Sequence, residues 1–154
     1  MNNSIDVLLI EDSVEDCIML KNVCNHYADI SIHVYNEPTL QSALQLLKIR
    51  TFDLILSDLN LPDSKGVKTI AAIHKASPDV PLVVVSSNDD INLIRECVEF
   101  GAHTFIHKSE MNGNLSRAII TAKVKQDILK QKQTTLLNAF RTAFSTETQT
   151  QQTI

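Results

Sequence analysis

The sequence of 154 residues has few glycines and no long apolar stretch, and both absences exclude classes of function. It contains only three glycines and neither the G-x-G-x-x-G nor the P-loop pattern, which argues against a nucleotide-binding α/β domain. No segment approaches the roughly 20 apolar residues of a membrane-spanning helix. The net charge of −4 gives no sign of a general affinity for nucleic acid or for anionic membranes, so neither is expected as a direct partner.

Cysteine and histidine are too sparse and too scattered for a metal or redox motif. Cys17, Cys24 and Cys97 have no Cys-x-x-Cys spacing and fall in helical patterns, so we expect buried free thiols. The first residues do not place a basic segment before an apolar one, so no signal peptide is expected. Together these features predict a cytoplasmic protein.

Short apolar runs alternate with helical patterns along the chain. Such runs suit strands buried on both faces, and apolar residues at i, i+3, i+4 and i+7 indicate helices with one buried face. The alternation predicts an α/β fold with a parallel sheet and right-handed crossovers. The expected strands are residues 7–10, 31–35, 53–57, 82–85 and 104–107, of which 31–35 is mixed in character and expected near an edge.

The chain changes character after residue 130. Apolar residues still recur at helical spacing between positions 136 and 144, but from position 145 only polar residues precede the final Ile154. We therefore expect a domain of residues 1–130 and an extension of residues 131–154 that is helical at first and disordered at its end. The extension could dimerise, connect to a further domain, pack back on the first domain or fray.

Reactive side chains follow four of the five expected strands. Chemistry in an open parallel sheet gathers outside the carboxyl ends of the strands, so these side chains are expected to meet. Three of them are carboxylates, which repel one another unless a cation lies among them, and oxygen ligands of this kind suit Mg²⁺. The residues are Glu11 and Asp12 after the first strand, Asp58 after the third, Ser86 after the fourth and Lys108 after the fifth.

The chemistry of these residues predicts a phosphoryl-transfer site. Asp58 would be both a magnesium ligand and a nucleophile, because an aspartate carboxylate can form an acyl phosphate. Lys108 would place a positive charge on one phosphoryl oxygen, and the hydroxyl of Ser86 would donate to another. Each residue alone is more often a turn, cap or solvated surface residue. Their joint occurrence at four strand ends favours the chemical interpretation.

With these residues and the segment Asp-Leu-Asn-Leu-Pro-Asp-Ser-Lys-Gly at 58–66, the chain resembles the receiver domain of two-component response regulators from about residue 7 to about residue 130. The resemblance implies a flavodoxin-like, doubly wound (βα)5 fold with a five-stranded parallel sheet in the order 2-1-3-4-5. It implies a signalling switch in a phosphorelay rather than an enzyme, with self-phosphorylation and autodephosphorylation at Asp58 as its only reactions. The implied phosphodonor is a histidine kinase or a histidine phosphotransfer protein, and the implied downstream partner is a protein target or an output domain.

The resemblance also implies how the metal is held. Asp12 and Asp58 would bind Mg²⁺ directly, and Glu11 would act through a water molecule. The backbone carbonyl of Asn60 would supply a further ligand. The side chains of Asn60 and Asn88 stand at positions that tune the lifetime of the phosphoryl group in this family.

The switch is implied in the same way. Phe105 holds the position of the switch aromatic, which would turn inward while Ser86 moves toward the phosphate. This change would alter the face made by the fourth helix, the fifth strand and the fifth helix, through which a homodimer is possible. The chain departs from the family in two places here, because Phe105 lacks the hydroxyl of the commoner tyrosine and Ser109 stands after Lys108 in place of the usual proline.

Other functions compete with this interpretation. Phosphotransferases and phosphatases of the haloacid dehalogenase type also use an aspartyl phosphate, but they have Asp-x-Asp on the first strand, whereas this chain has Asp58-Leu-Asn60 on the third. Two alternatives stay open. The domain could be a phosphorylation-independent scaffold with the same fold, or the receiver fragment of a larger regulator or hybrid kinase.

Overall fold

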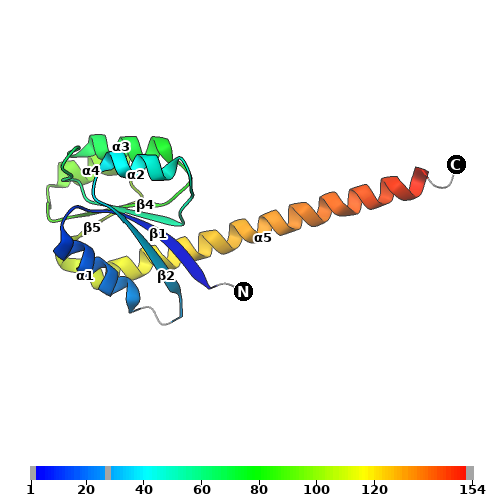
Figure 1. The fold of residues 1–154 in the computed structure, drawn as a ribbon, viewed down its shortest axis with the longest axis horizontal. Coiled ribbons are helices and arrows are strands. Elements are labelled where there is room, and N and C mark those ends of the chain that lie inside the picture. Colours follow the sequence, from blue (N-terminus) through cyan, green and yellow to red (C-terminus); the bar gives the residue numbers. More distant parts are fainter. Residues whose placement is uncertain (1–2, 27–28, 152–154) are drawn as a thin grey trace. The chain divides into compact units, whose positions relative to one another are not determined.

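A computed structural model describes residues 3–26 and 29–151, with side chains as far as Ser145, and it has the predicted alternation of strands and helices. Five parallel strands form one sheet in the order β2-β1-β3-β4-β5 (Figure 1), so the expected fold and strand order are confirmed. The strands are β1 (Ser4–Ile10), β2 (Ser31–Glu37), β3 (Leu54–Ser57), β4 (Leu82–Ser86) and β5 (Thr104–His107).

Helices connect the strands and follow the last one. A short 3₁₀ helix that the sequence patterns did not predict, η1, lies between β5 and the final helix. The helices are α1 (Val14–Asn25), α2 (Leu40–Leu47), α3 (Val67–Ala76), α4 (Ile91–Glu99), η1 (Lys108–Glu110) and α5 (Met111–Gln151).

The sheet separates two hydrophobic clusters, because successive side chains of a strand point to opposite faces. In β1, Val7 and Leu9 belong to one cluster and Leu8 and Ile10 to the other. Helix α1 and the first three turns of α5 cover the first face, and α2, α3 and α4 cover the second (Figure 1). All three cysteines are buried free thiols on these helices, as expected.

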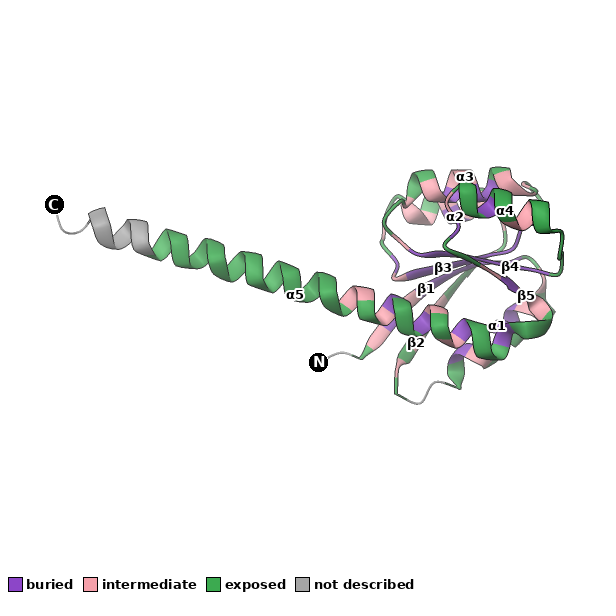
Figure 2. Ribbon diagram, turned by 180° about the vertical axis from the view of Figure 1, so that it is seen from behind, coloured by how far each residue is buried: buried purple, intermediate pink, exposed green. Residues whose placement is uncertain are grey.

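Burial distinguishes the central strands from the edge. Every residue of β3 and β4 is buried, which explains why their sequences are continuous apolar runs (Figure 2). Strand β2 has no buried residue and lies at one edge of the sheet, as its mixed sequence predicts.

The ends of the helices follow local sequence signals. The Ser13 hydroxyl accepts a hydrogen bond from the backbone of Asp16 and caps α1, and Asp90 caps α4 in the same way. Gly101 follows the end of α4 with φ of 123°, a conformation that side chains rarely adopt. Because β1, β3 and β4 pair in parallel, the loops after β1 and β4 lie at the same edge of the sheet.

Helix α5 spans two compact units of the chain, Met1–Ala122 and Lys123–Ile154. It runs through residues 145–151, where the polar sequence predicts disorder, because that segment contains no glycine or proline to end it. Residues 152–154 of the expected tail lie outside the described residues. The division of the chain near residue 130 and the role of the extension stay predictions. No helix within the described ranges is both long enough and apolar enough to cross a membrane.

Candidate functional site

Asp58 directly follows β3 and lies at the carboxyl end of the sheet. Its backbone amide donates to the carbonyl oxygen of Ile10 over 3.0 Å, which extends the pairing of β3 with β1 by one residue. The residue after Ile10 is Glu11, so this pairing sets the two carboxylates side by side. Asp58 is 8% exposed and Glu11 is 2% exposed, which makes both of them buried acidic residues.

Three carboxylates meet here as the sequence predicts. Glu11, Asp12 and Asp58 each offer one oxygen, and these oxygens all lie within 4.8 Å of one another. The Oδ1 atom of Asp58 accepts hydrogen bonds from the backbone amides of Leu59 (2.7 Å) and Asn60 (3.3 Å). These two amides fix the orientation of the carboxylate and leave its Oδ2 atom facing Lys108.

Lys108 binds three acidic side chains at once. Its Nζ atom lies 3.1 Å from Glu11 Oε2, 3.2 Å from Asp58 Oδ2 and 2.5 Å from Asp16 Oδ2. Burial alone would lower the pKa of this ammonium group. The hydrogen bond to Asp16 and the charges of Asp58 and Glu11 outweigh burial, so the pKa of Lys108 is raised above its ordinary value. The lysine is therefore a fixed positive charge in the site.

Glu11 shows the electrostatic cost of the arrangement. Its burial, and next to that the charge of Asp58, raise the pKa of the carboxyl group, although the hydrogen bond from the Ser13 amide and the ammonium group of Lys108 oppose the rise. The Oε1 atom accepts from the Ser13 amide over 3.0 Å. The buried Oε2 atom has no hydrogen bond of regular geometry and only the ion pair with Lys108. A further cation beside these oxygens would relieve that cost.

The residues present fit a hard divalent cation. All the candidate side-chain ligands are carboxylate oxygens, and one of them, Glu11 Oε2, is buried with a single partner. Mg²⁺ is usually bound through one or two carboxylates while it retains several waters. Because Asp12 is exposed, the cluster is open to solvent on one side and has room for such waters.

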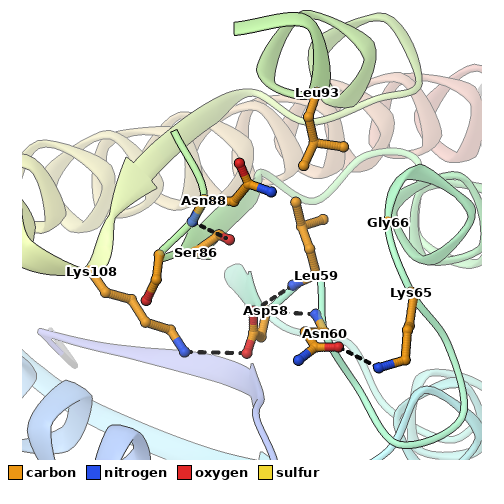
Figure 3. A pocket seen from close by; sticks show the side chains of 10 residues that line it. Asp58, Leu59, Asn60, Lys65, Gly66, Ser86, Asn88, Leu93 and Lys108 are labelled. Carbon is orange, nitrogen blue, oxygen red and sulfur yellow. Dashed lines mark hydrogen bonds and ion pairs between the residues drawn. The ribbon is translucent and has the colours of Figure 1, made fainter. Parts of the chain in front are cut away.

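A cavity of about 460 Å³ opens beside Asp58 and Lys108 (Figure 3). Ser86, the last residue of β4, also lines it. The Oγ atom of Ser86 accepts from the Asn88 amide over 3.1 Å, so the hydroxyl hydrogen is available to a ligand. The remaining lining residues come from the loops after β3 and β4 and from α4; they are Leu59, Asn60, Lys65, Gly66, Ser87, Asn88 and Leu93.

The two asparagines expected to tune the phosphoryl lifetime both lie at this cavity. The side-chain oxygen of Asn60 accepts from Lys65 Nζ over 2.6 Å, and that of Asn88 accepts from the amide of Asp90 over 2.9 Å. Their roles stay predictions, but both amide groups are held by neighbours in the structure.

Phe105 lies apart from the cavity lining. It is half-buried on β5 and packs against the hydrophobic cluster beneath α2, α3 and α4. The peptide bond between Lys108 and Ser109 is trans, as are all others in the described ranges. His107, which the sequence gives no catalytic role, accepts at Nδ1 from the Ser109 amide (3.1 Å), so its Nε2 donates to the Ser87 carbonyl (3.0 Å). This ring joins the loop after β4 to the start of η1.

Two residues of the site escaped the sequence analysis. Asp16 lies in the first turn of α1, where an acidic residue needs no other explanation than the helix dipole. Its position three residues after the N-cap Ser13 gives no sign of a contact with Lys108. Lys65 lies in the loop after β3, where a lysine is ordinarily solvated.

Comparison with known proteins shows the family to which this chain is similar. The family model of the response regulator receiver domain matches residues 7–120. The regulatory protein LuxO of Vibrio cholerae is 33% identical over 110 residues, which are 68% of this chain and 24% of LuxO. The cell cycle transcriptional regulator CtrA of Caulobacter vibrioides is 29% identical over 125 residues, 76% of this chain and 51% of CtrA. The chain therefore spans about a quarter to a half of these relatives.

Solved structures share the fold. The signal receiver domain of an HD domain-containing protein from Pseudomonas fluorescens superposes with a TM-score of 0.71 at 21% identity, covering 85% of this chain and 94% of that one. A CheY-like receiver domain protein from Methanospirillum hungatei superposes with a TM-score of 0.69 at 20% identity, covering 79% and 95%.

Proposed function

This chain belongs to the response regulator receiver domain family, and from that membership we propose that Asp58 accepts a phosphoryl group from a phosphorylated histidine of a partner protein. The observation that carries the proposal is the 3.2 Å ion pair between Lys108 Nζ and Asp58 Oδ2 in the wall of an open cavity. An ammonium group in that position can hold a phosphoryl oxygen while the carboxylate attacks phosphorus.

The transfer exchanges one bond to phosphorus for another. An oxygen of Asp58 bonds to phosphorus, the bond from phosphorus to the donor nitrogen breaks, and its electron pair stays on that nitrogen. In a later step water attacks phosphorus and the bond from phosphorus to the Asp58 oxygen breaks, which restores the carboxylate and releases inorganic phosphate. These two reactions are the only chemistry we propose, with Lys108 and the Ser86 hydroxyl each binding one phosphoryl oxygen.

We propose Mg²⁺ as the cofactor. Asp12 and Asp58 would bind it directly, Glu11 through a water, and Asn60 through its backbone carbonyl. When bound, the ion supplies positive charge that offsets the carboxylates and the phosphoryl oxygens. The cluster of oxygens within 4.8 Å supports this assignment.

We propose that phosphorylation changes the shape of one protein-binding surface. Ser86 and Phe105 would move on phosphorylation and alter the face made by α4, β5 and α5, through which the domain would dimerise or bind a target. The side chains of Asn60 and Asn88 would set how long the phosphorylated form lasts. The activity of a longer protein that carries this domain is part of the same proposal, because the relatives extend well beyond it.

Family members interact with histidine kinases and output domains. For this chain we propose that the phosphodonor, a histidine kinase or a phosphotransfer protein of the cytoplasm, docks on α1. Val14 and Ile18 of that helix are 73% and 55% exposed, which gives a partner an apolar contact. The same helix carries Asp16, which contacts Lys108, so a protein bound there reaches the site.

Acetyl phosphate provides the test without a partner protein. Incubated with Mg²⁺, the chain is expected to gain one phosphoryl group in intact-mass spectra and a shifted band in Phos-tag gels. Asp58→Asn removes the acceptor and should abolish both signals, and Asp89→Asn, an exposed carboxylate after β4, should leave them unchanged. A folded wild-type chain that gains no mass would refute the proposal and favour a phosphorylation-independent interaction domain.

A further inference from the structure

Lys65 is the second lysine that lines the cavity, and the fold holds it there. The segment after β3 turns back on itself, so that Asn60 and Lys65 face each other in an antiparallel bridge. The Gly66 amide donates to the Leu59 carbonyl over 2.8 Å and closes the segment. The backbone of Lys65 is therefore fixed opposite the residue that lies two positions after Asp58.

The turn of this segment, between Asn60 and Lys65, is anchored as well. Both carboxylate oxygens of Asp63 accept backbone amides at the start of α2, from Leu40 and Gln41, each over 2.9 Å. These bonds hold the loop against a helix of the core, so the position of Lys65 at the cavity is a fixed property of the fold.

The two lysines differ in how their charges are balanced. Lys108 is surrounded by three carboxylates, whereas the ammonium group of Lys65 donates to the neutral amide of Asn60 over 2.6 Å (Figure 3). In the part of the chain that the structure describes, Lys65 forms no ion pair. Lys65 is also exposed, so its side chain exchanges partners at little cost.

The site has more negative charge than its own lysine can balance. Glu11, Asp16 and Asp58 contact the ammonium group of Lys108, and Asp12 adds a fourth carboxylate close to Glu11 and Asp58. A phosphodonor brings further negative charge into this cavity, and a cation at its rim would lower the repulsion. Lys65 is the lysine in that place.

We propose that Lys65 is a second phosphate-binding residue, which leaves Asn60 and binds an oxygen of the incoming phosphodonor during phosphorylation of Asp58. This inference rests on the proposed function and adds to it a residue that selects anionic phosphodonors. It also couples two features of the site, because the side-chain amide of Asn60 becomes free when Lys65 binds the donor.

The initial rate of phosphorylation by acetyl phosphate with Mg²⁺ tests this role. Below saturation, Lys65→Gln is expected to lower the rate about two- to fivefold, the size of one exposed charge pair, and Lys65→Arg to retain at least half of it. Lys68→Gln removes the same charge from an exposed position on α3 and should have no effect. The deficit of Lys65→Gln should shrink toward none at about 0.5 M salt, where exposed charges are screened.

A second background separates binding of the donor from positioning of Asn60. In an Asn60→Ala chain, Lys65→Gln should still slow phosphorylation, and no effect there would show that Lys65 only holds Asn60. Equal rates for wild type and Lys65→Gln, or an equal loss in Lys68→Gln, would also overturn the inference while leaving Asp58 as the acceptor. Absence of phosphorylation in the wild type would overturn the proposed function, and the inference with it.

Discussion

Replacing Lys108 by methionine tests how the site is held together. The lysine side chain is 13% exposed, and it lies between a Glu11 side chain that is 1% exposed and an Asp58 side chain that is 10% exposed. Methionine fills a similar volume but removes the positive charge that contacts these acids. Breaking a buried ion pair from one side costs about 3–5 kcal/mol.

The expected loss lies near the lower end of that range. The third partner, Asp16, has a side chain that is 28% exposed, so water can solvate it once the lysine is gone. We expect the free energy of unfolding to fall by about 3 kcal/mol in the absence of divalent ions. For a domain of this size that loss moves the urea midpoint by roughly 1–2 M.

Urea denaturation in EDTA measures the loss of stability in Lys108→Met, and the same experiment with Mg²⁺ measures how much of that loss the cation recovers. Mg²⁺ should recover more than half of the loss in Lys108→Met, because a divalent cation can replace the missing charge. The control Lys68→Met, on an exposed position of α3, should stay within about 0.5 kcal/mol of wild type. A Lys108→Met chain as stable as the control in EDTA would refute this account of the charges.

The same variant has a pH dependence whose sign follows from Glu11. The pKa of this carboxyl is already raised, chiefly by burial, and loss of the lysine raises it further. A group with a raised pKa in the folded state contributes stability at low pH that is lost as the pH rises through the folded pKa. The deficit of Lys108→Met should therefore be largest at neutral pH and shrink toward roughly pH 4.5. A deficit that grows on acidification would contradict this explanation.

Three further predictions concern Asp63 in the loop after β3 and two glycines, Gly101 after α4 and Gly113 in α5. Backbone hydrogen bonds from α2 lower the pKa of Asp63. The carboxylate therefore stabilises the fold at neutral pH, and this stabilisation is lost as the pH falls through the pKa of the folded state. In urea denaturation, the midpoints of wild type and Asp63→Asn should differ at pH 7 and converge in acid. Gly101→Ala should cost about 1–3 kcal/mol, because φ is 123° and the new methyl group would overlap the His74 ring. Gly113→Ala meets nothing within 4 Å and should stabilise α5 by up to about 1 kcal/mol, and an equal loss in both glycine variants would refute the steric argument.

Much of the fold could be predicted because burial dictates residue type in a parallel sheet. A strand covered on both faces must be apolar throughout, and residues 82–85 meet that condition in sequence and in structure. The order of the strands was not available from pattern alone, because short loops fix only that successive strands lie near one another. The family resemblance supplied it.

The site was predictable to the extent that backbone position decides it. Glu11, Asp58 and Lys108 stand directly after strands of the sheet, and parallel pairing brings the ends of those strands to one edge. The contacts of Asp16 and Lys65 depend instead on where long side chains reach across loops and a helix turn. In the sequence, Asp16 is explained by the helix dipole and Lys65 by solvent exposure in a loop, so neither pattern predicts the contact that the side chain makes in the site.

The two lysines at the cavity, Lys108 and Lys65, differ in what a phosphoryl oxygen must displace in order to bind them. Asp16 competes for Lys108 over 2.5 Å, so any phosphoryl oxygen that binds Lys108 must displace a carboxylate. Lys65 gives up only a neutral amide and is exposed, so on the proposed role it meets an incoming phosphodonor first. Removing the competitor should then favour the buried lysine. Asp16→Asn weakens one of the three contacts of Lys108, and in that background the loss of phosphorylation rate caused by Lys65→Gln is expected to be smaller than in the wild type.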